Sequence, residues 1–418
     1  MHYNKILNTL ESEENRKMIH IAVLGYGTVG SGVVEVIETN KDSISRRAGD
    51  EINIKYILDL REFPGDPYEN KVVHDINIIL DDPEVSVICE TMGGNEPAFT
   101  FSKNALLKGK SVCTSNKELV ANHGPELIQT AKNNNCNYLF EASVGGGIPI
   151  ICPLNSSLTP EKIDAITGIL NGTTNYILTK MDEDDANFDD VLKEAQDKGY
   201  AERNPEADIE GYDAGRKIAI LSSLVKGKNV KYESVYTEGI TKIETADFAY
   251  ARKMKRAVKL LAMCKDTEDG FYVMAAPFMI PKGHPLYSVS GVFNAVYVHG
   301  NMLGDSMYYG RGAGKLPTAS AVVSDVIDCA RHPGKTITCF WDEQDLDVMD
   351  IADTKRRFFV RVTDSVKDKA VSVFTGIEEV EAQAAGEFAF VTPVMTEREF
   401  DEKIASIGGC INRIRIEG

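Results

Sequence analysis

Residues 19–37 read Ile-His-Ile-Ala-Val-Leu-Gly-Tyr-Gly-Thr-Val-Gly-Ser-Gly-Val-Val-Glu-Val-Ile, and this stretch decides the fold. The run 19–24 is short and almost entirely apolar, which is typical of a parallel strand buried on both faces. Gly25, Gly27 and Gly30 follow at once, and valines then recur at helical spacing. In such a strand–turn–helix the first glycine bends the chain, the second lets a pyrophosphate approach the backbone, and the third packs the helix on the strand. A dinucleotide site is therefore favoured over a turn whose glycines are merely tolerated.

The composition bounds the class of protein and its ligands. A chain of 418 residues is long enough for two or three domains, and 43% hydrophobic with 26% charged residues is ordinary for a soluble protein. The formal net charge of -17 repels nucleic acid and anionic membrane surfaces. Any polyanionic ligand must therefore be held by a local site, which suits a coenzyme and not DNA.

The cysteines and the chain start indicate a reducing compartment. The 8 cysteines are scattered without a Cys-x-x-Cys pair, so we interpret them as reduced thiols and not as ligands or disulfides. The segment 1–17 is polar and has no apolar core of a signal peptide, and no apolar run approaches bilayer length. We expect a cytoplasmic protein with neither membrane nor nucleic-acid partners.

A second predicted strand, 52–58, ends at Asp59 and is followed by Arg61. An acid at this strand end would bind the ribose hydroxyls of NAD, whereas a nearby arginine would accommodate the extra phosphate of NADP. A strand-end acid that simply faces solvent is an equally good interpretation. Coenzyme preference therefore stays open.

Further strands are predicted at 85–89, 111–114 and 138–141, separated by helices at 96–107 and 125–133. Alternation of strand and helix predicts an α/β fold with a Rossmann-type, doubly wound parallel sheet. Ligands of such sheets bind beyond the carboxyl ends of the strands. Three polar segments stand at those ends: 90–94, 115–117 and 141–149.

Two residues of these segments have alternative interpretations. A lysine at a strand end is usually just solvated. Lys117 is a candidate site residue only because it shares a predicted crevice with the glycine turn. Glu141, with a glycine-rich segment behind it, could offer a carboxylate and several carbonyls to a hard cation. The same segment is equally compatible with a hinge that leaves the first domain.

The second half of the chain has a different pattern of strands, helices and polar runs. A strand at 165–170 is followed by 171–175, which opens a helix and offers Asn and Thr as natural N-caps, and the polar run 199–213 leads into another helix. Asp213 and Lys217 are four positions apart and leave the same side of that helix. On spacing alone, a surface ion pair worth about 0.3–0.5 kcal/mol is the preferred interpretation.

The remaining elements complete a second domain and a small module. Residues 310–318 form a second glycine loop before a helix, suited to an anion or a flat ring. After a linker at 331–354, the order strand, helix, strand, strand, helix, strand predicts a ferredoxin-like module. The other predictions here are a long charged helix at 246–264, strands at 271–279, 295–299 and 302–309, and a helix at 319–330.

Taken together and in this order, the polar segments closely resemble those of homoserine dehydrogenase over roughly 19–330. No single segment decides this, but unrelated dinucleotide-binding proteins share only the first. The main departure is Arg203-Asn204-Pro205, where the family usually has Asp before the proline. The segments that carry the resemblance are 25–30, 90–94, 115–117, 141–151, 168–175, 199–217 and 312–321.

The resemblance implies three domains. We expect a dinucleotide-binding Rossmann domain at 1–150, completed by 310–335, and an α+β substrate-binding, catalytic and dimerisation domain at 151–309. We expect a module at 355–418 that resembles the ACT domain. The chain would then form a homodimer or homotetramer.

The resemblance also implies the reaction and its residues. The family reduces L-aspartate 4-semialdehyde to L-homoserine with NADH or NADPH, a step toward threonine and methionine. Lys217 would be the proton donor to the forming alkoxide, with Lys117 as the alternative. The implied substrate-binding residues are Gly172, Thr173, Glu202, Asp208 and Asp213; the cofactor-binding residues are Gly25, Gly27, Thr28, Val29, Gly30, Asp59, Arg61, Ser115, Lys117 and Gly312; and a monovalent cation, sodium or potassium, would be held by Glu141, Val144, Gly146 and Ile148.

Two other functions are kept in view. A coenzyme-binding or amino-acid-sensing protein without turnover could lose both lysines freely, and this chain retains both. Another NAD(P)-dependent semialdehyde or hydroxy-acid dehydrogenase would leave the segment 202–217 unexplained.

The C-terminal module departs from its own pattern. ACT domains commonly follow their first strand with an Asp-x-Pro-Gly turn whose N–H groups face an amino-acid effector. Residues 364–369 here read Asp-Ser-Val-Lys-Asp-Lys, with neither the proline nor the glycine. We therefore expect a module retained for packing or subunit contact, with weak or absent threonine inhibition.

Overall fold

The computed structural model describes residues 18–417, which form two compact units. The first contains the described residues up to Ser156 together with Ala313–Glu343, and the second contains Ser157–Gly312 and Gln344–Gly418. None of the helices within 18–417 has the length and apolarity to cross a membrane. The expectation about 1–17 lies outside the described residues.

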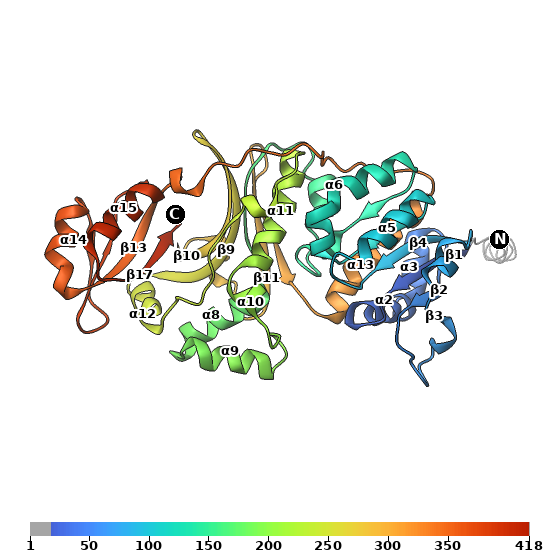
Figure 1. Cartoon of the computed structure of the whole chain (residues 1–418), viewed down its shortest axis with the longest axis horizontal. Helices are drawn as coiled ribbons and strands as arrows, with labels where there is room; N and C mark the ends of the chain where they lie inside the picture. Colours follow the sequence, from blue (N-terminus) through green and yellow to red (C-terminus); the bar gives the residue numbers. More distant parts are fainter. Residues whose placement is uncertain (1–17, 418) are drawn as a thin grey trace, which may run out of the picture. The chain divides into compact units, whose positions relative to one another are not determined.

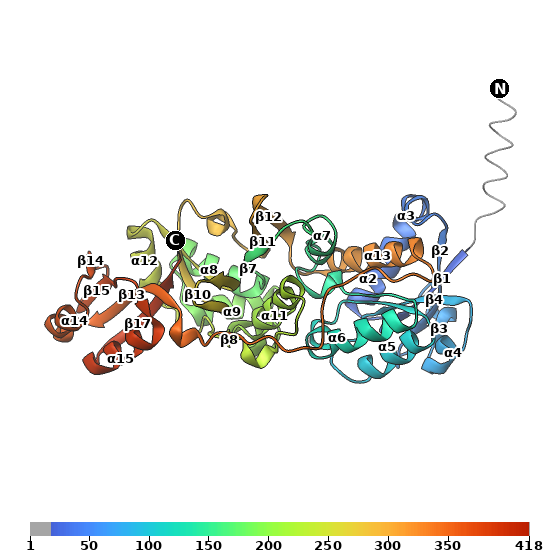
Figure 2. The same ribbon diagram turned by 90° about the horizontal axis from the view of Figure 1, so that it is seen from above.

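The first unit is built on a parallel sheet. Its strand order, within the described residues, is β3-β2-β1-β4-β5-β6, and every neighbouring pair is parallel. Figure 2 shows α2 and α13 on one side of this sheet and α5 and α6 on the other. The predicted doubly wound Rossmann-type sheet is therefore confirmed. Its elements are β1 (Met18–Leu24), α2 (Thr28–Thr39), α3 (Lys41–Ala48), β2 (Glu51–Leu58), β3 (Val72–Val73), α4 (Ile76–Leu80), β4 (Val85–Glu90), α5 (Ala98–Leu107), β5 (Ser111–Thr114), α6 (Lys117–Asn133), β6 (Tyr138–Leu139), α7 (Ile151–Asn155) and α13 (Lys315–Arg331).

The core of the first unit explains why these residues form these elements. Ile21 and Val23 on β1 pack with Val33 and Ile37 on α2, and all four side chains are almost fully buried. The helix face predicted from the valine spacing is therefore the face that covers the sheet. Helix α13 is separated in sequence from the rest of the first unit, and it contributes Val322 and its neighbours to the same core.

Two boundaries in this unit differ from the sequence prediction. Helix α6 begins at Lys117, and Pro125, predicted as a helix start, lies inside it. A proline suits the first turn because it lacks an N–H, and the sequence gives no sign that a full turn precedes it. Strand β6 ends at Leu139, and Glu141 begins a short 3₁₀ turn instead of ending the strand.

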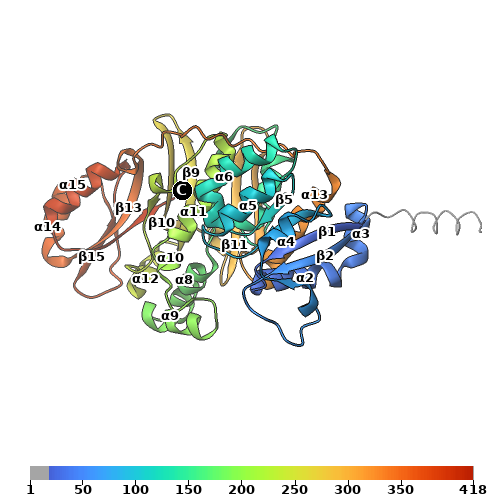
Figure 3. The same cartoon turned by 45° about the vertical axis from the view of Figure 1, so that its right-hand side comes forward.

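The second unit is built on a mixed sheet, labelled in Figures 1 and 3. In the described residues this 11-stranded sheet has the order β12-β11-β7-β9-β10-β17-β13-β15-β14, with β8 paired to β10 and β16 to β13. Its strands are β7 (Ile163–Ile169), β8 (Tyr236–Thr237), β9 (Arg256–Thr267), β10 (Gly270–Pro281), β11 (Phe293–Gly300), β12 (Gly304–Arg311), β13 (Lys355–Thr363), β14 (Glu378–Val380), β15 (Glu387–Val391), β16 (Met395–Thr396) and β17 (Cys410–Ile416). Its helices are α8 (Gly172–Asp184), α9 (Phe188–Asp197), α10 (Glu206–Ile209), α11 (Tyr212–Lys226), α12 (Thr245–Lys253), α14 (Lys367–Val373) and α15 (Glu397–Ile407).

The predicted long helix at 246–264 is wrong. Helix α12 ends at Lys253, and β9 then runs through Arg256–Thr267 between β7 and β10. The reversal is made at Lys255, whose φ of 57° lies in the left-handed region. A central strand buried on both faces has the same unbroken apolar run as a buried helix, so periodicity alone cannot distinguish the two.

The C-terminal elements appear in the predicted order, with the short β16 in addition. Along β13, Phe358 and Val360 pack with α15 residue Phe400, while Arg361 faces the other way and binds Asp247 of α12 at 2.7 Å. This strict alternation is the period of a strand covered on both faces. Strand β17 joins the module to β10 by parallel pairing at Phe278–Arg415, so one sheet continues through the whole unit.

Candidate active site

The glycine turn of the first unit has the geometry that its sequence predicts. Gly25 adopts φ 88°, which favours glycine, and bends the chain after β1. A side-chain carbon on Gly27 would meet no atom within 4 Å, so the backbone there is open to a ligand. A side-chain carbon on Gly30 would stand 1.9 Å from the Gly25 carbonyl oxygen, so only glycine lets α2 pack on the turn. Thr28 and Val29 are the first residues of α2, whose N-terminus therefore faces this turn.

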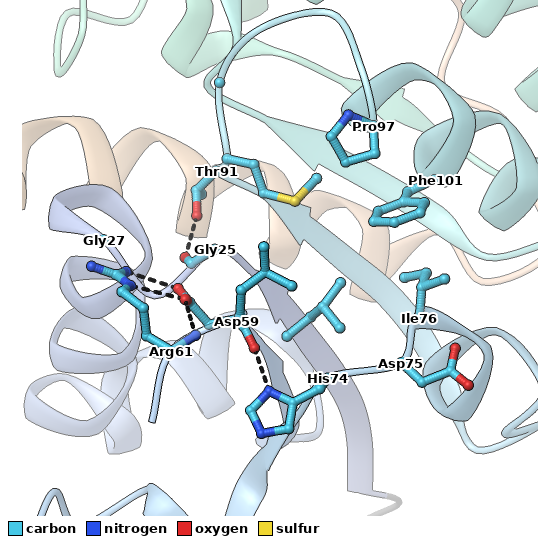
Figure 4. A pocket seen from close by; sticks show the side chains of 14 residues that line it. Gly25, Gly27, Asp59, Arg61, His74, Asp75, Ile76, Thr91, Pro97 and Phe101 are labelled. Atoms are coloured by element: carbon cyan, nitrogen blue, oxygen red, sulfur yellow. Dashed lines mark hydrogen bonds and ion pairs between the residues drawn. The ribbon is translucent and has the colours of Figure 1, made fainter. Parts of the chain in front are cut away.

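A cavity of about 650 Å³ lies beside this turn and is lined by Gly25, Gly27, Asp59 and Arg61, among others (Figure 4). Arg61 donates to both oxygens of the Asp59 carboxylate, at 2.9 Å and 2.8 Å, and Tyr26 N–H donates to it at 2.8 Å. The bond from Arg61 lowers the pKa of Asp59 well below its usual range. Asp59 is thus an ionised acid whose charge is compensated by Arg61 at the wall of the cavity.

The strand ends predicted to meet do meet. Thr91 Oγ1 donates to the Gly25 carbonyl at 2.9 Å, and Thr114 Oγ1 donates to Glu90 at 2.6 Å. Asn116, the N-cap of α6, donates to the Gly94 carbonyl at 2.6 Å. These bonds tie the ends of β1, β4 and β5 together. Ser115 and Lys117 flank Asn116, and both are half-buried.

Glu141 lies in the same unit, and its carboxylate makes hydrogen bonds that the sequence did not predict. It accepts N–H bonds from Ile150 at 2.6 Å, Ile151 at 2.9 Å and Cys152 at 2.5 Å, and so caps the N-terminus of α7. Burial raises its pKa despite these bonds. Val144, Gly146 and Ile148 follow on the adjacent loop, with Val144 and Ile148 buried. Within 18–417, no three His, Cys, Asp or Glu side chains are grouped as a metal site.

The second unit gathers a separate polar cluster around Asn171. The Asn171 amide donates to Asp208 at 2.7 Å and to Asp213 at 2.8 Å, while its oxygen accepts the Thr174 N–H at 2.9 Å and caps α8. Lys217 Nζ donates to Asp213 at 2.7 Å and to the carbonyl of Leu170 at 2.7 Å. Two acids and one lysine are therefore fixed at the start of α8 and α11.

The Asp213–Lys217 pair is not the surface ion pair that its spacing favours. The two side chains do pair, but they are only 3% and 11% exposed. A lysine held this far from solvent beside one carboxylate is unusual, since taking the charges out of water costs several kcal/mol. Buried ion pairs of this kind occur at functional sites and also in structural networks.

The other predicted substrate residues lie on the same elements. Gly172 is the first residue of α8, and a side-chain carbon there would stand 2.9 Å from the Val292 carbonyl oxygen. Thr173 Oγ1 donates to the Tyr200 carbonyl at 2.6 Å. Glu202 is exposed between α9 and α10.

Gly312 is the last residue of the first of the two segments of the second unit, and it lies against the buried side-chain amide of Asn294. A side-chain carbon on Gly312 would stand 2.0 Å from Asn294 Nδ2, so this close approach admits only glycine. Asn294 is 1% exposed, and neither amide atom has a hydrogen-bond partner within the described residues. Buried polar groups of this kind are rare in proteins.

Sequence reasoning missed the part played by Asn171 and by Asn294. Asn171 is recognisable as an N-cap, but its bonds to Asp208 and Asp213 span 37 and 42 positions and depend on the tertiary fold. Asn294 sits in an ordinary apolar strand sequence that gives no local signal.

Comparisons with known proteins agree with this architecture. The family model described as "Homoserine dehydrogenase, NAD binding domain" matches residues 25–141, and the model described as "Homoserine dehydrogenase" matches 149–327. Homoserine dehydrogenase from Helicobacter pylori is 40% identical over 370 residues, covering 88% of this chain and 86% of the relative. The Bacillus subtilis enzyme of the same name is 42% identical over 314 residues, covering 74% of this chain and 72% of the relative.

Solved structures show the same likeness in three dimensions. A homoserine dehydrogenase from Thiobacillus denitrificans superposes with a TM-score of 0.88 at 35% identity, covering 96% of this chain and 99% of that one. A hyperthermophilic archaeal homoserine dehydrogenase mutant in complex with NADPH has a TM-score of 0.64 at 30% identity and covers 75% of this chain and 98% of that one. With two matched family models, these relatives and the observed strand order, the chain belongs to the homoserine dehydrogenase family.

Proposed function

We propose that this NAD(P)-dependent oxidoreductase reduces L-aspartate 4-semialdehyde to L-homoserine with Lys217 as the proton donor. When bound at the glycine turn, NAD(P)H would supply a hydride to the aldehyde carbon, and this would leave negative charge on the oxygen. The Lys217 ammonium gives a proton to that oxygen, and in the reverse direction the neutral amine takes it back. The observation that carries this proposal is the buried Lys217, held by Asp213 and by the Leu170 carbonyl.

The acids around Asn171 are proposed to bind the substrate ammonium. Asp208 and Asp213 are drawn together by one amide, and Glu202 is the exposed acid of the same segment. Carboxylates are the natural partners of an ammonium group. Gly172 and Thr173 would line the same pocket, where a larger residue at 172 would collide with the backbone.

The coenzyme site is proposed on the glycine turn of the first unit. Gly25, Gly27, Thr28, Val29 and Gly30 would hold the pyrophosphate, and Asp59 with Arg61 the ribose end. Ser115 and Lys117 are proposed for the nicotinamide end. The open approach to Gly27 and the free N-terminus of α2 support this assignment.

A monovalent cation is proposed to bind the loop carbonyls near Glu141. The Glu141 carboxylate already accepts hydrogen bonds from three N–H groups. It is therefore less suited to bind a cation than a carboxylate without such partners. The remaining candidates are the backbone carbonyls of Glu141, Val144, Gly146 and Ile148.

We also propose a homo-oligomer, dimer or tetramer, in the cytoplasm. Strand β12 is the last strand in the order of its sheet within the described residues, and Met307 and Tyr309 on it are 46% and 53% exposed. Apolar edge strands of this kind pair with a second chain. The eight cysteines are all free thiols, which is usual in reducing compartments. Light scattering after gel filtration measures the subunit number.

The activity is tested by following coenzyme absorbance with NADPH or NADH and aspartate semialdehyde, and in reverse with homoserine. We expect turnover in both directions. Coenzyme binding without turnover of either compound would instead show a regulatory protein, and turnover of other semialdehydes only would show a different dehydrogenase.

A further inference from the structure

Glu238 connects the end of the chain to the polar cluster of the second unit. It follows β8, and its Oε2 accepts from Arg415 at 2.6 Å, from Arg413 at 3.0 Å and from the Tyr236 hydroxyl at 2.9 Å. Both arginines lie on β17, the last strand. Arg415 is fully buried, so its charge depends on the partners around it.

The far side of Arg415 is held just as firmly. Its Nε and Nη2 donate to the two oxygens of Glu397, at 2.8 Å and 2.7 Å. Glu397 is the first residue of α15, and its side chain is 5% exposed. The guanidinium is therefore fixed between the C-terminal module and Glu238, with little freedom to follow a displaced partner.

The backbone that follows Glu238 lies directly under the turn between α10 and α11. Ile240 N–H donates to the Ile209 carbonyl at 2.8 Å. A side-chain carbon on Gly239 would stand 2.3 Å from the same carbonyl, so the two segments touch. Gly211, with φ 81°, packs on the Glu238 carbonyl. Residues 238–240 thus form the support of this turn.

The supported turn carries the two acids of the candidate site. Asp208 precedes it on α10, and Asp213 follows it on α11. Both acids reach the one Asn171 amide, at 2.7 Å and 2.8 Å, so a small shift of the turn would separate them. Hydrogen bonds weaken steeply when distance and angle depart from these values, and misplacement by about 1 Å can cost roughly 100-fold in rate.

We propose that Glu238, clamped by Arg413 and Arg415, is a positioning residue for substrate binding, so that the C-terminal strand sets the affinity for the substrate ammonium. This inference rests on the proposed function, in which Asp208 and Asp213 bind that ammonium. It gives the C-terminal module a task in catalysis without an effector.

The test is Glu238→Gln, which keeps the size of the side chain and removes its charge. The matched control is Glu233→Gln, an exposed acid on the same segment. We expect Glu238→Gln to raise the KM for homoserine by about tenfold or more and to lower kcat as well, because Asp213 on the same turn holds Lys217, while the KM for coenzyme stays nearly unchanged. Glu233→Gln should behave as wild type. A homoserine KM within about twofold of wild type, with only a lower melting temperature, would overturn the proposal.

A second variant covers the case in which Glu238→Gln does not fold. Arg413 is partly exposed, so Arg413→Gln removes one clamp with less risk, and Arg413→Lys keeps the charge. The homoserine KM should rise for Arg413→Gln and return most of the way for Arg413→Lys. Equal KM values for the two variants and wild type would overturn the proposal.

Asp208→Asn and Asp213→Asn, measured in parallel, separate this proposal from the proposed function. If both raise the homoserine KM and Glu238→Gln does not, positioning by Glu238 is wrong and the ammonium site stands. If neither raises it, the ammonium assignment fails, and the positioning proposal fails with it even if Glu238→Gln has an effect.

Discussion

At the scale of single residues, Asn171 decides whether the two acids of the second unit act together. Its amide bonds to Asp208 and Asp213 are charge-assisted, and such bonds contribute about 1.5–3 kcal/mol each. We predict that Asn171→Ala raises the KM for homoserine by roughly 10- to 100-fold. Steady-state kinetics in the direction of homoserine oxidation measures the change.

Loss of a helix cap must be separated from this effect. Asn187 caps the neighbouring α9 through the Asp190 N–H, far from the two acids in its contacts. Asn187→Ala should lose about 1 kcal/mol of stability, as caps do, with an unchanged KM. Equal KM values for the two alanine variants would contradict the role given to Asn171.

The candidate site was predictable only in part. The resemblance named Asp213 and Lys217, whereas their spacing alone favoured a surface pair. Both the surface interpretation and the catalytic interpretation include an ion pair between Asp213 and Lys217. They differ in the burial of the two side chains. Burial depends on the packing of α11 against β7, β9 and β10, which no local pattern in the sequence displays. The resemblance also named Glu141, but its capping of α7 could not be predicted, since the three N–H groups belong to the start of a short helix that the sequence pattern does not predict.

At the scale of elements, two glycines of the strand–turn–helix at 19–37 have different roles. Gly27 leaves space for a ligand, and Gly30 lets the helix pack on the turn. We predict that Gly27→Ala keeps wild-type stability and loses coenzyme affinity by about tenfold or more, because its side-chain carbon meets only the space where the pyrophosphate approaches. Gly30→Ala should destabilise the fold by about 1–3 kcal/mol, because α2 must move away from the Gly25 carbonyl.

Urea unfolding and coenzyme titration by fluorescence measure the two effects. The two variants serve as controls for each other, since both add one methyl group to the same turn. Loss of stability in Gly27→Ala with normal coenzyme binding would contradict the assignment of this turn.

The support under α10 and α11 predicts a dependence on pH. Burial by itself would raise the pKa of Glu238, but Arg415 and Arg413 together lower it to about 2 from its ordinary value of 4.5. A group whose pKa is lowered by folding stabilises the fold above the unfolded value and loses this effect as pH falls through the folded value. We predict that stability from this group is lost between about pH 4.5 and 2, and that Glu238→Gln shows a shallower loss over that range.

Unfolding free energies of both proteins across this range, from urea denaturation, provide the measurement. The comparison isolates Glu238, because all other carboxylates are common to the two proteins. Parallel curves would show that the arginine clamp does not change the ionisation of this acid.

The wrong prediction of a helix at 246–264 has a physical cause. The run 257–264 is apolar apart from Lys259 and has no clear period, and only its place between β7 and β10 makes it a strand. The turn at 19–37 was predictable because glycine positions, apolar run and helix spacing all indicate one structure. Long apolar runs carry a single signal, burial, which a helix and a central strand satisfy equally.

At the scale of the whole molecule, the C-terminal module is continuous with the sheet of the second unit. Lys367 and Lys369, the residues that would replace backbone donors in its shortened turn, bind Glu379 at 3.4 Å and the Ile407 carbonyl at 3.3 Å. An effector carboxylate would have to displace these contacts. We therefore predict weak or absent inhibition by threonine.

Titrating threonine into the forward assay tests this prediction. Strong inhibition at about millimolar threonine or below would contradict it, especially if Asp364→Ala or Lys367→Ala abolished the effect. These two variants lie away from Asp213 and Lys217 in their contacts, so they should leave the basal rate unchanged.

The central claim is that Lys217 is the proton donor. The decisive measurement is the turnover number of Lys217→Ala and Lys117→Ala, together with coenzyme affinity by fluorescence. Lys226→Ala is the matched control, because Lys226 lies on the same helix and pairs with Asp266. We predict that Lys217→Ala lowers kcat by at least about 100-fold and leaves coenzyme affinity nearly unchanged, while Lys226→Ala stays near wild type. Near wild-type turnover in Lys217→Ala, with Lys117→Ala inactive, would contradict the account and move the donor role to Lys117.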